Sequence, residues 1–173
     1  VLRRDLESRG IRAHVIGTDQ WLLDANLRTS SLAGRYDFPS LRAFSQSLMK
    51  RELDTTIEFK NYDKLKRKNL ATGELIRIGQ SDVVIIEGTI ALFLAQELPA
   101  ANKLFVSIAE PIRKRRVITE YTLRGKSPEE AATVYQERNL DEVPAILQSG
   151  IGCLNFDVSA ALHHDEADAT MSL

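Results

Sequence analysis

The run Val83-Val84-Ile85-Ile86 constrains the fold more than any other segment of this 173-residue chain. Four consecutive β-branched residues favour a strand, and their side chains are apolar on both faces. Such a strand is typical of the interior of a parallel sheet, where helices cover each side. Short apolar segments at 13–17 and 103–108 have the same character. The sequence therefore predicts a parallel sheet that contains these three strands.

Helical patterns separate the predicted strands. Residues 1–9 read as the later turns of a helix that stops at Gly10, and a second helix is expected from Ser40. A third is expected over 111–123, and Ser127-Pro128-Glu129-Glu130 is a capping box that begins a fourth. Residues 54–80 are polar and mixed, which suggests a hairpin or small lobe, and 156–158 is a weak last strand. The alternation predicts one α/β domain over 1–173, doubly wound and mostly parallel, with helices on both faces.

The bulk composition excludes several classes. Lys and Arg number 23 against 24 Asp and Glu, so no global charge attracts nucleic acid or an anionic membrane. Cys153 is the only cysteine, which rules out an intrachain disulfide. No apolar run reaches the roughly 18 residues of a membrane span. A cytoplasmic protein is expected, and a homo-oligomer stays open.

Two acidic residues end predicted strands. Asp19 follows the strand at 13–17, and Glu87 follows Ile86 directly. In open α/β sheets ligands bind at the carboxyl ends of the strands. Phosphoryl transfer needs Mg²⁺ near the phosphates and a carboxylate that deprotonates the attacking hydroxyl. Glu87 is the candidate ligand of Mg²⁺, and Asp19 is the candidate base that deprotonates the hydroxyl. The alternative is that each acid only caps a turn.

A basic cluster lies further along the chain. Arg113-Lys114-Arg115-Arg116 is followed by Arg124-Gly125-Lys126, and the spacing of eight lets Arg116 and Arg124 share a helix face. Arginine side chains suit phosphate oxygens, so region 111–127 is a candidate lid that clamps a transferring phosphoryl group. The alternative is a solvated helix face.

The ordered motifs resemble those of uridine kinases, a family of P-loop kinases, over nearly the whole chain. The matching segments are Thr18-Asp19-Gln20-Trp21, Tyr36-Asp37-Phe38-Pro39, Asn61-Tyr62-Asp63, Asp82 to Gly88, and Lys103 to Val106 with the arginines after it. The resemblance implies ATP and Mg²⁺ as cofactors and a phosphotransferase with an alcohol acceptor.

The resemblance also implies roles for matching residues. Asp19 resembles the catalytic base, and Glu87 resembles the acid that works with Mg²⁺. Tyr36, Asp37 and Tyr62 fall in substrate-binding segments, with 54–80 as a substrate lobe. Arg115, Arg116 and Arg124 resemble lid residues that contact ATP phosphates.

Departures from the family pattern affect the acceptor. Arg67 stands where the family typically has His, Asn69 replaces an Arg, and Thr119 replaces a lid Arg. An arginine in the acceptor pocket favours an anionic substrate, such as a phosphorylated sugar or a carboxylate. A phosphoribulokinase-like or pantothenate kinase-like acceptor is therefore an alternative within the enzymes.

The motif G-x-x-x-x-G-K-[ST], whose backbone amides and lysine cradle phosphates, occurs nowhere in the 173 residues. By family order it would precede Val1, so the chain is expected to be a fragment and to have little activity alone. The rival hypothesis from another class is a non-catalytic nucleotide-fold module that binds a partner. His163 and His164 are a weak metal candidate near a polar end of the chain.

Overall fold

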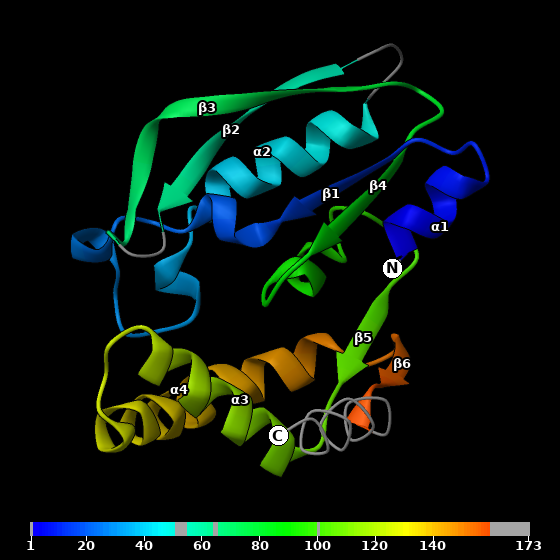
Figure 1. Cartoon of the computed structure of the whole chain (residues 1–173). Helices are drawn as coiled ribbons and strands as arrows, with labels where there is room; N and C mark the ends of the chain where they lie inside the picture. Colours follow the sequence, from blue (N-terminus) through cyan, green and yellow to red (C-terminus); the bar gives the residue numbers. More distant parts are fainter. Residues whose placement is uncertain (1, 51–54, 64–65, 100, 160–173) are drawn as a thin grey trace. The chain divides into compact units, whose positions relative to one another are not determined.

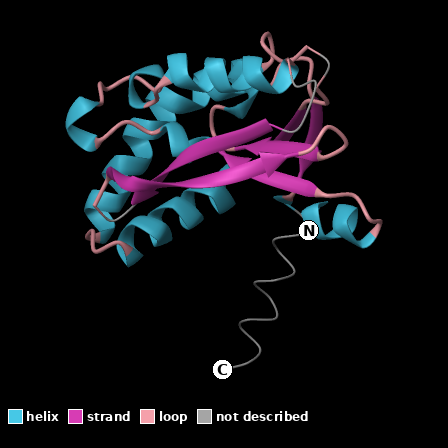
Figure 2. Ribbon diagram, turned by 90° about the horizontal axis from the view of Figure 1, so that it is seen from above, coloured by secondary structure: helices cyan, strands magenta, loops and turns pink. Residues whose placement is uncertain are grey.

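The apolar runs at 13–17 and 83–87 form a parallel pair of strands in the computed structural model, which describes residues 2–50, 55–63, 66–99 and 101–159. β1 (Ala13–Gly17) is in register with β4 (Val83–Glu87), from Ala13 opposite Val83 to Gly17 opposite Glu87. Ile16 is fully buried, whereas Val15, which points to the other face of β1, is 41% exposed and the residues of β4 are half-buried or exposed. The described strand pair is therefore not covered on both faces, contrary to the prediction of an interior strand. Helices and strands alternate through much of the chain (Figure 2), as the sequence predicts.

The chain divides into two compact units, Val1–Ala101 and Asn102–Leu173. The first unit contains α1 (Leu2–Ser8), α2 (Phe38–Met49) and the β1–β4 pair (Figure 1). Residues 54–80, expected to be a hairpin or lobe, contain a long antiparallel hairpin of β2 (Thr55–Asp63) and β3 (Lys68–Ile78). Single turns of 3₁₀ helix, η1 (Thr18–Trp21), η2 (Ala25–Leu27), η3 (Ala33–Arg35) and η4 (Ala91–Leu94), connect these elements. Among the described residues of the first unit, the fully buried large apolar side chains are Ile16, Leu41, Ile78, Ile90 and Leu94.

α1 and α2 begin and end where local chemistry dictates. Gly10 follows α1 with φ +75°, a left-handed conformation that glycine adopts without strain. α2 starts at Phe38, two residues before the predicted start at Ser40, because Asp37 is its N-cap and Pro39 is compatible with a first turn. Leu41 and Phe44 on one face of α2 are buried, as predicted.

The second unit pairs β5 (Leu104–Ser107) in parallel with β6 (Leu154–Asp157), which begins two residues before the predicted last strand. Between them run α3 (Glu110–Leu123) and α4 (Pro128–Ser149). The predicted capping box is present: Ser127 accepts from the Glu130 amide, and Glu130 accepts from the Ser127 amide. The described strands thus form three separate two-stranded sheets, β1–β4, β2–β3 and β5–β6. Within the described residues, the strand at 103–108 is therefore not hydrogen-bonded into the sheet of β1 and β4, contrary to the prediction of one parallel sheet, because its partner is β6.

Candidate active site

The carboxyl ends of β1 and β4 meet at one edge of their pair. Gly17 is the Cα partner of Glu87, so Thr18 and Asp19 leave β1 where Glu87 and Gly88 leave β4. Glu87 is exposed and Asp19 is half-buried. The two acidic residues that the sequence singles out therefore belong to neighbouring strand ends.

Two glycines let these strand ends approach closely. A Cβ at Gly17 would lie 2.9 Å from the Glu87 Oε1 atom, so the carboxylate of Glu87 folds over Gly17. A Cβ at Gly88 would lie 2.1 Å from the Thr18 hydroxyl oxygen, and Gly88 has φ +126°. The Thr18 side chain is fully buried, and its hydroxyl makes no hydrogen bond among the described residues. Any side chain at position 88 would push the two strand ends apart.

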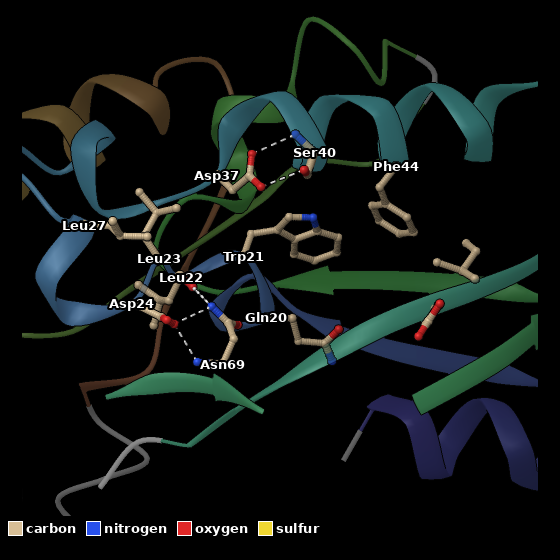
Figure 3. A pocket seen from close by; sticks show the side chains of 12 residues that line it. Gln20, Trp21, Leu22, Leu23, Asp24, Leu27, Asp37, Ser40, Phe44 and Asn69 are labelled. Atoms are coloured by element: carbon tan, nitrogen blue, oxygen red, sulfur yellow. Dashed lines mark hydrogen bonds between the residues drawn. The ribbon is translucent and has the colours of Figure 1, made fainter. Parts of the chain in front are cut away.

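A cavity of about 420 Å³ begins directly after Asp19. The turn η1 contains Asp19 and continues into Gln20 and Trp21, which line the cavity (Figure 3). The apolar lining consists of Trp21, Leu22, Leu23, Leu27, Phe44 and Ile57, and the polar lining of Gln20, Asp24, Asp37, Ser40, Glu58 and Asn69. One short turn thus connects a carboxylate at the strand end with the wall of a cavity of ligand size.

Asn69 on β3 fastens the hairpin to the loop after η1. Its backbone N–H donates to Asp24 Oδ1 at 2.7 Å, and its side-chain amide donates to the same oxygen and to the Leu22 carbonyl, both at 3.0 Å (Figure 3). The backbone N–H of Asn69, more than any other group, lowers the pKa of Asp24 from its ordinary value. Asp24 is therefore a carboxylate at neutral pH.

Asp37 and Trp21 form the side of the cavity next to α2. Both carboxylate oxygens of Asp37 accept from Ser40, one from the backbone N–H and one from the hydroxyl. The Asp37 backbone N–H donates to the Trp21 carbonyl at 2.8 Å. The rings of Trp21 and Phe44 lie 5.0 Å apart between centroids. This wall is consequently fixed by a helix cap, a backbone hydrogen bond and a ring contact.

Of the four residues predicted to bind substrate, Asp37 lines the cavity and the others lie outside its lining. Tyr36 is buried, with its ring edge-on to Phe38 at 6.3 Å. Tyr62 receives a hydrogen bond from Arg28, whose guanidinium lies 5.1 Å from the ring centroid. Arg67 is exposed, with φ +53°, and its carbonyl accepts from the Ala25 amide.

Sequence reasoning missed several polar residues of the cavity: Gln20, Asp24, Ser40, Glu58 and Asn69. A usable signal existed for Gln20, because it directly follows Asp19 in the motif at the end of β1. Asn69 was noticed only as a departure from the family pattern. Trp21 follows Gln20 in the same motif, and the structure places its side chain in the wall of the cavity.

The predicted lid arginines belong to α3 and its end, in the second unit. Arg115 and Arg116 are exposed. Arg124 forms an ion pair with Glu120, and its guanidinium lies 5.5 Å from the Tyr121 ring centroid. Arg113 instead joins the helices, because it donates to the Tyr135 hydroxyl and to Asn139. The basic cluster therefore contains one arginine with a structural task and others on the surface.

Within the described residues, no group of three or more His, Cys, Asp and Glu is arranged to hold a metal ion. The histidine pair at 163 and 164 lies outside those residues. No described helix combines the length and apolar character needed to cross a membrane.

No protein-family model matches the chain. Among solved structures, the chain is similar to a putative fructose transport system kinase from Silicibacter sp. TM1040, with a TM-score of 0.72 and 18% identity over 90% of this chain and 80% of that one. It is also similar to D-glycerate 3-kinase from Cryptococcus neoformans var. grubii, with a TM-score of 0.57 and 18% identity over 92% of this chain and 80% of that one. Together with the parallel strand pairs, these likenesses show the predicted α/β fold, similar to that of these two kinases.

Proposed function

We propose that the protein is an ATP-dependent kinase, of a uridine kinase-like branch, that transfers the γ-phosphoryl group of ATP to a hydroxyl of a small molecule. The carrying observation is η1, which begins beside Glu87 at the paired strand ends, contains Asp19, and continues into the cavity wall at Gln20 and Trp21. Base, metal carboxylate and acceptor must lie close together in phosphoryl transfer. The kinase names of both similar structures support the proposal.

Asp19 is the proposed general base. The acceptor lies in the cavity against Trp21 and directs one hydroxyl towards Asp19. The Asp19 carboxylate takes the hydroxyl proton while the acceptor oxygen bonds to the γ-phosphorus. The bond from that phosphorus to the bridging oxygen breaks, and ADP leaves with the electron pair. Asp37 is a less suitable base because Ser40 occupies both of its oxygens.

Glu87 is the proposed Mg²⁺ ligand. It is exposed at the end of β4, and Mg²⁺ needs only one or two protein carboxylates because it keeps several waters. The donor set therefore fits. When bound with ATP, Mg²⁺ would neutralise charge on the phosphate oxygens. Arg115, Arg116 and Arg124 are the proposed contacts to ATP phosphates, and Tyr36, Tyr62 and Arg67 stay predictions as substrate residues.

The function is tested by screening ATP consumption against a panel of nucleosides, sugars and other small alcohols. Because the phosphate-loop motif is absent from the 173 residues, the screen has two arms: this chain, and a product that includes any coding sequence upstream of Val1. Acceptor-dependent formation of ADP and of a phosphate ester supports the kinase. ATP-independent partner binding with no transfer in either arm supports the non-catalytic module instead.

The balanced charge and the single cysteine support a cytoplasmic protein with ATP and a small molecule as partners, and without nucleic acid or membrane. Cell fractionation of the tagged protein checks this part of the proposal.

A further inference from the structure

The polar atoms on the cavity wall are mainly hydrogen-bond acceptors. Asp24, Asp37 and Glu58 contribute carboxylates. The side-chain oxygens of Gln20 and Asn69 are buried and have no hydrogen-bond partner among the described residues. The two amide oxygens are buried and out of reach of a ligand, whereas Asp24 is half-buried and Glu58 is exposed. A ligand beside these carboxylates has to bring N–H or O–H donors, because a carboxylate only accepts hydrogen bonds.

Asn69 and Ser40 supply donors on the same wall that are used within the protein. The amide nitrogen of Asn69 donates to Asp24 and to the Leu22 carbonyl. The Ser40 hydroxyl donates to Asp37. These two donors are therefore not available to a ligand that is rich in acceptors.

The charged residues that line the cavity, Asp24, Asp37 and Glu58, are all acidic. No Lys, Arg or His is among the described residues that line the cavity. Arg28 and Lys68 lie near enough to contribute to the lowered pKa of Asp24, although less than Asn69 does. Arg28 is engaged by the Leu23 carbonyl and the Tyr62 hydroxyl. An anionic group in the cavity would lie beside like charges, which opposes binding.

Two of the six apolar residues of the wall, Trp21 and Phe44, are aromatic. Trp21 and Phe44 contact each other at 5.0 Å between centroids, and Trp21 lies in the middle of the view in Figure 3. An aromatic ring covers the C–H face of a saturated ring or the face of a flat one and leaves the hydroxyl groups at the edge free for the acceptors.

We propose that the acceptor is a polyhydroxylated ring compound that carries no acidic group, held between Trp21 and the carboxylates of Asp24 and Glu58. This inference rests on the proposed kinase function and specifies its substrate class. It replaces the anionic acceptor that Arg67 suggests in the sequence, because Arg67 lies outside the cavity lining.

The test uses Trp21 as a reporter, since it is the only tryptophan of the chain and lines the cavity. Ribose, fructose, glucose and uridine are titrated without nucleotide, each beside its phosphate ester. At least one neutral compound should change the fluorescence saturably, and its ester should bind at least about tenfold more weakly. An ester that binds as tightly as its neutral partner overturns the proposal, and so does a panel without any saturable neutral member.

Reversing the charge of Glu58 tests whether the preference for neutral ligands arises in the cavity. Glu58→Lys should reduce the preference for the neutral partner by about fivefold, because Glu58 is exposed and its interactions are partly screened. The matched control is Glu74→Lys, an exposed acid on β3 that does not line the cavity, and it should leave the preference unchanged. An unchanged preference in Glu58→Lys contradicts the placement of the acceptor.

The titration distinguishes the two proposals because it requires no phosphoryl transfer. Saturable neutral binding without transfer from ATP in either arm of the screen keeps the inference about the cavity and rejects the kinase. Transfer to a phosphorylated or carboxylated acceptor keeps the kinase and rejects the substrate class.

Discussion

His14 and Asp82 form a hydrogen bond of 2.8 Å between the amino-terminal ends of β1 and β4, opposite the end that carries Asp19 and Glu87. Asp82 also accepts from the Gly79 backbone N–H at 2.8 Å. The hydrogen bond from His14, followed by that from Gly79, lowers the pKa of Asp82 below its ordinary value of 3.8. A side-chain hydrogen bond therefore joins β1 and β4 at their amino-terminal ends, while the proposed catalytic carboxylates lie at their carboxyl ends.

Asp82→Asn should remove a pH-dependent part of the free energy of unfolding. A carboxyl with a lowered folded pKa stabilises the protein above its unfolded pKa, and this stability disappears as pH falls through the folded pKa. The difference between wild type and variant should therefore be larger at about pH 7 than at about pH 2. Urea unfolding at both pH values measures it, with Asp5→Asn on the surface of α1 as control. Equal differences at both pH values would contradict the role of Asp82.

Asp19→Asn should lower kcat by about 10²- to 10⁴-fold, because the amide keeps the shape but cannot accept the hydroxyl proton. The dissociation constant for ATP should stay the same, since other groups hold the nucleotide. Steady-state kinetics and nucleotide titration on the active product supply both values. Near-normal turnover would reduce Asp19 to a turn cap and move the search for the base to Asp63 and Asp37.

Gly88→Ala should destabilise the first unit by about 1–3 kcal/mol, because position 88 requires φ +126° and the new Cβ meets Thr18. Gly10→Ala is the matched control: Gly10 also has positive φ, but nothing lies within 4 Å of the added Cβ. Chemical denaturation compares the two, and the excess loss in Gly88→Ala measures the contact at the strand ends. Equal losses would leave backbone strain as the whole cause.

Asn69→Ala should weaken acceptor binding about tenfold, because two side-chain hydrogen bonds that position Asp24 and the Leu22 carbonyl disappear. Since Asp19 is untouched, kcat should remain within about twofold. Titration of Trp21 fluorescence with the best neutral compound gives the affinity. Leu70→Ala, one residue further along β3 and outside the lining, should have no effect on it. A drop in kcat with unchanged affinity would place Asn69 in the chemical step instead.

The positions of the strands were predictable because β-branched runs are local signals, whereas their assembly was not: β1 and β4 are parallel as predicted, but β5 pairs with β6 in a separate sheet. The run at 83–86 identifies the strand β4 and places Glu87 at its carboxyl end, but among the described strands β4 pairs with β1 alone, so its predicted interior position is not observed. The start of α2 was missed because Asp37 and Pro39 were read as loop residues, although together they form the cap and first turn.

The cavity wall was less predictable because long-range contacts assemble it. Asn69 meets Asp24 across 45 residues of sequence, and no local pattern encodes where the hairpin folds back. Tyr62 and Arg67 occupy matching family positions, yet the hairpin turns Tyr62 towards Arg28 and leaves Arg67 exposed. A motif places a residue on an element, whereas the cavity depends on how separate elements pack.

The β2–β3 hairpin carries Ile57, Glu58 and Asn69, and it contributes no residue to the paired ends of β1 and β4. In evolutionary terms, the proposed acceptor contacts on the hairpin can vary while the proposed catalytic residues at the strand ends are kept, whereas Gln20 and Trp21 are tied to Asp19 through η1. Substitutions in the hairpin can accumulate and redirect the protein to another compound while Asp19 and Glu87 stay in place. Relatives with the same strand ends and different hairpins are therefore expected to share a reaction and differ in what they phosphorylate.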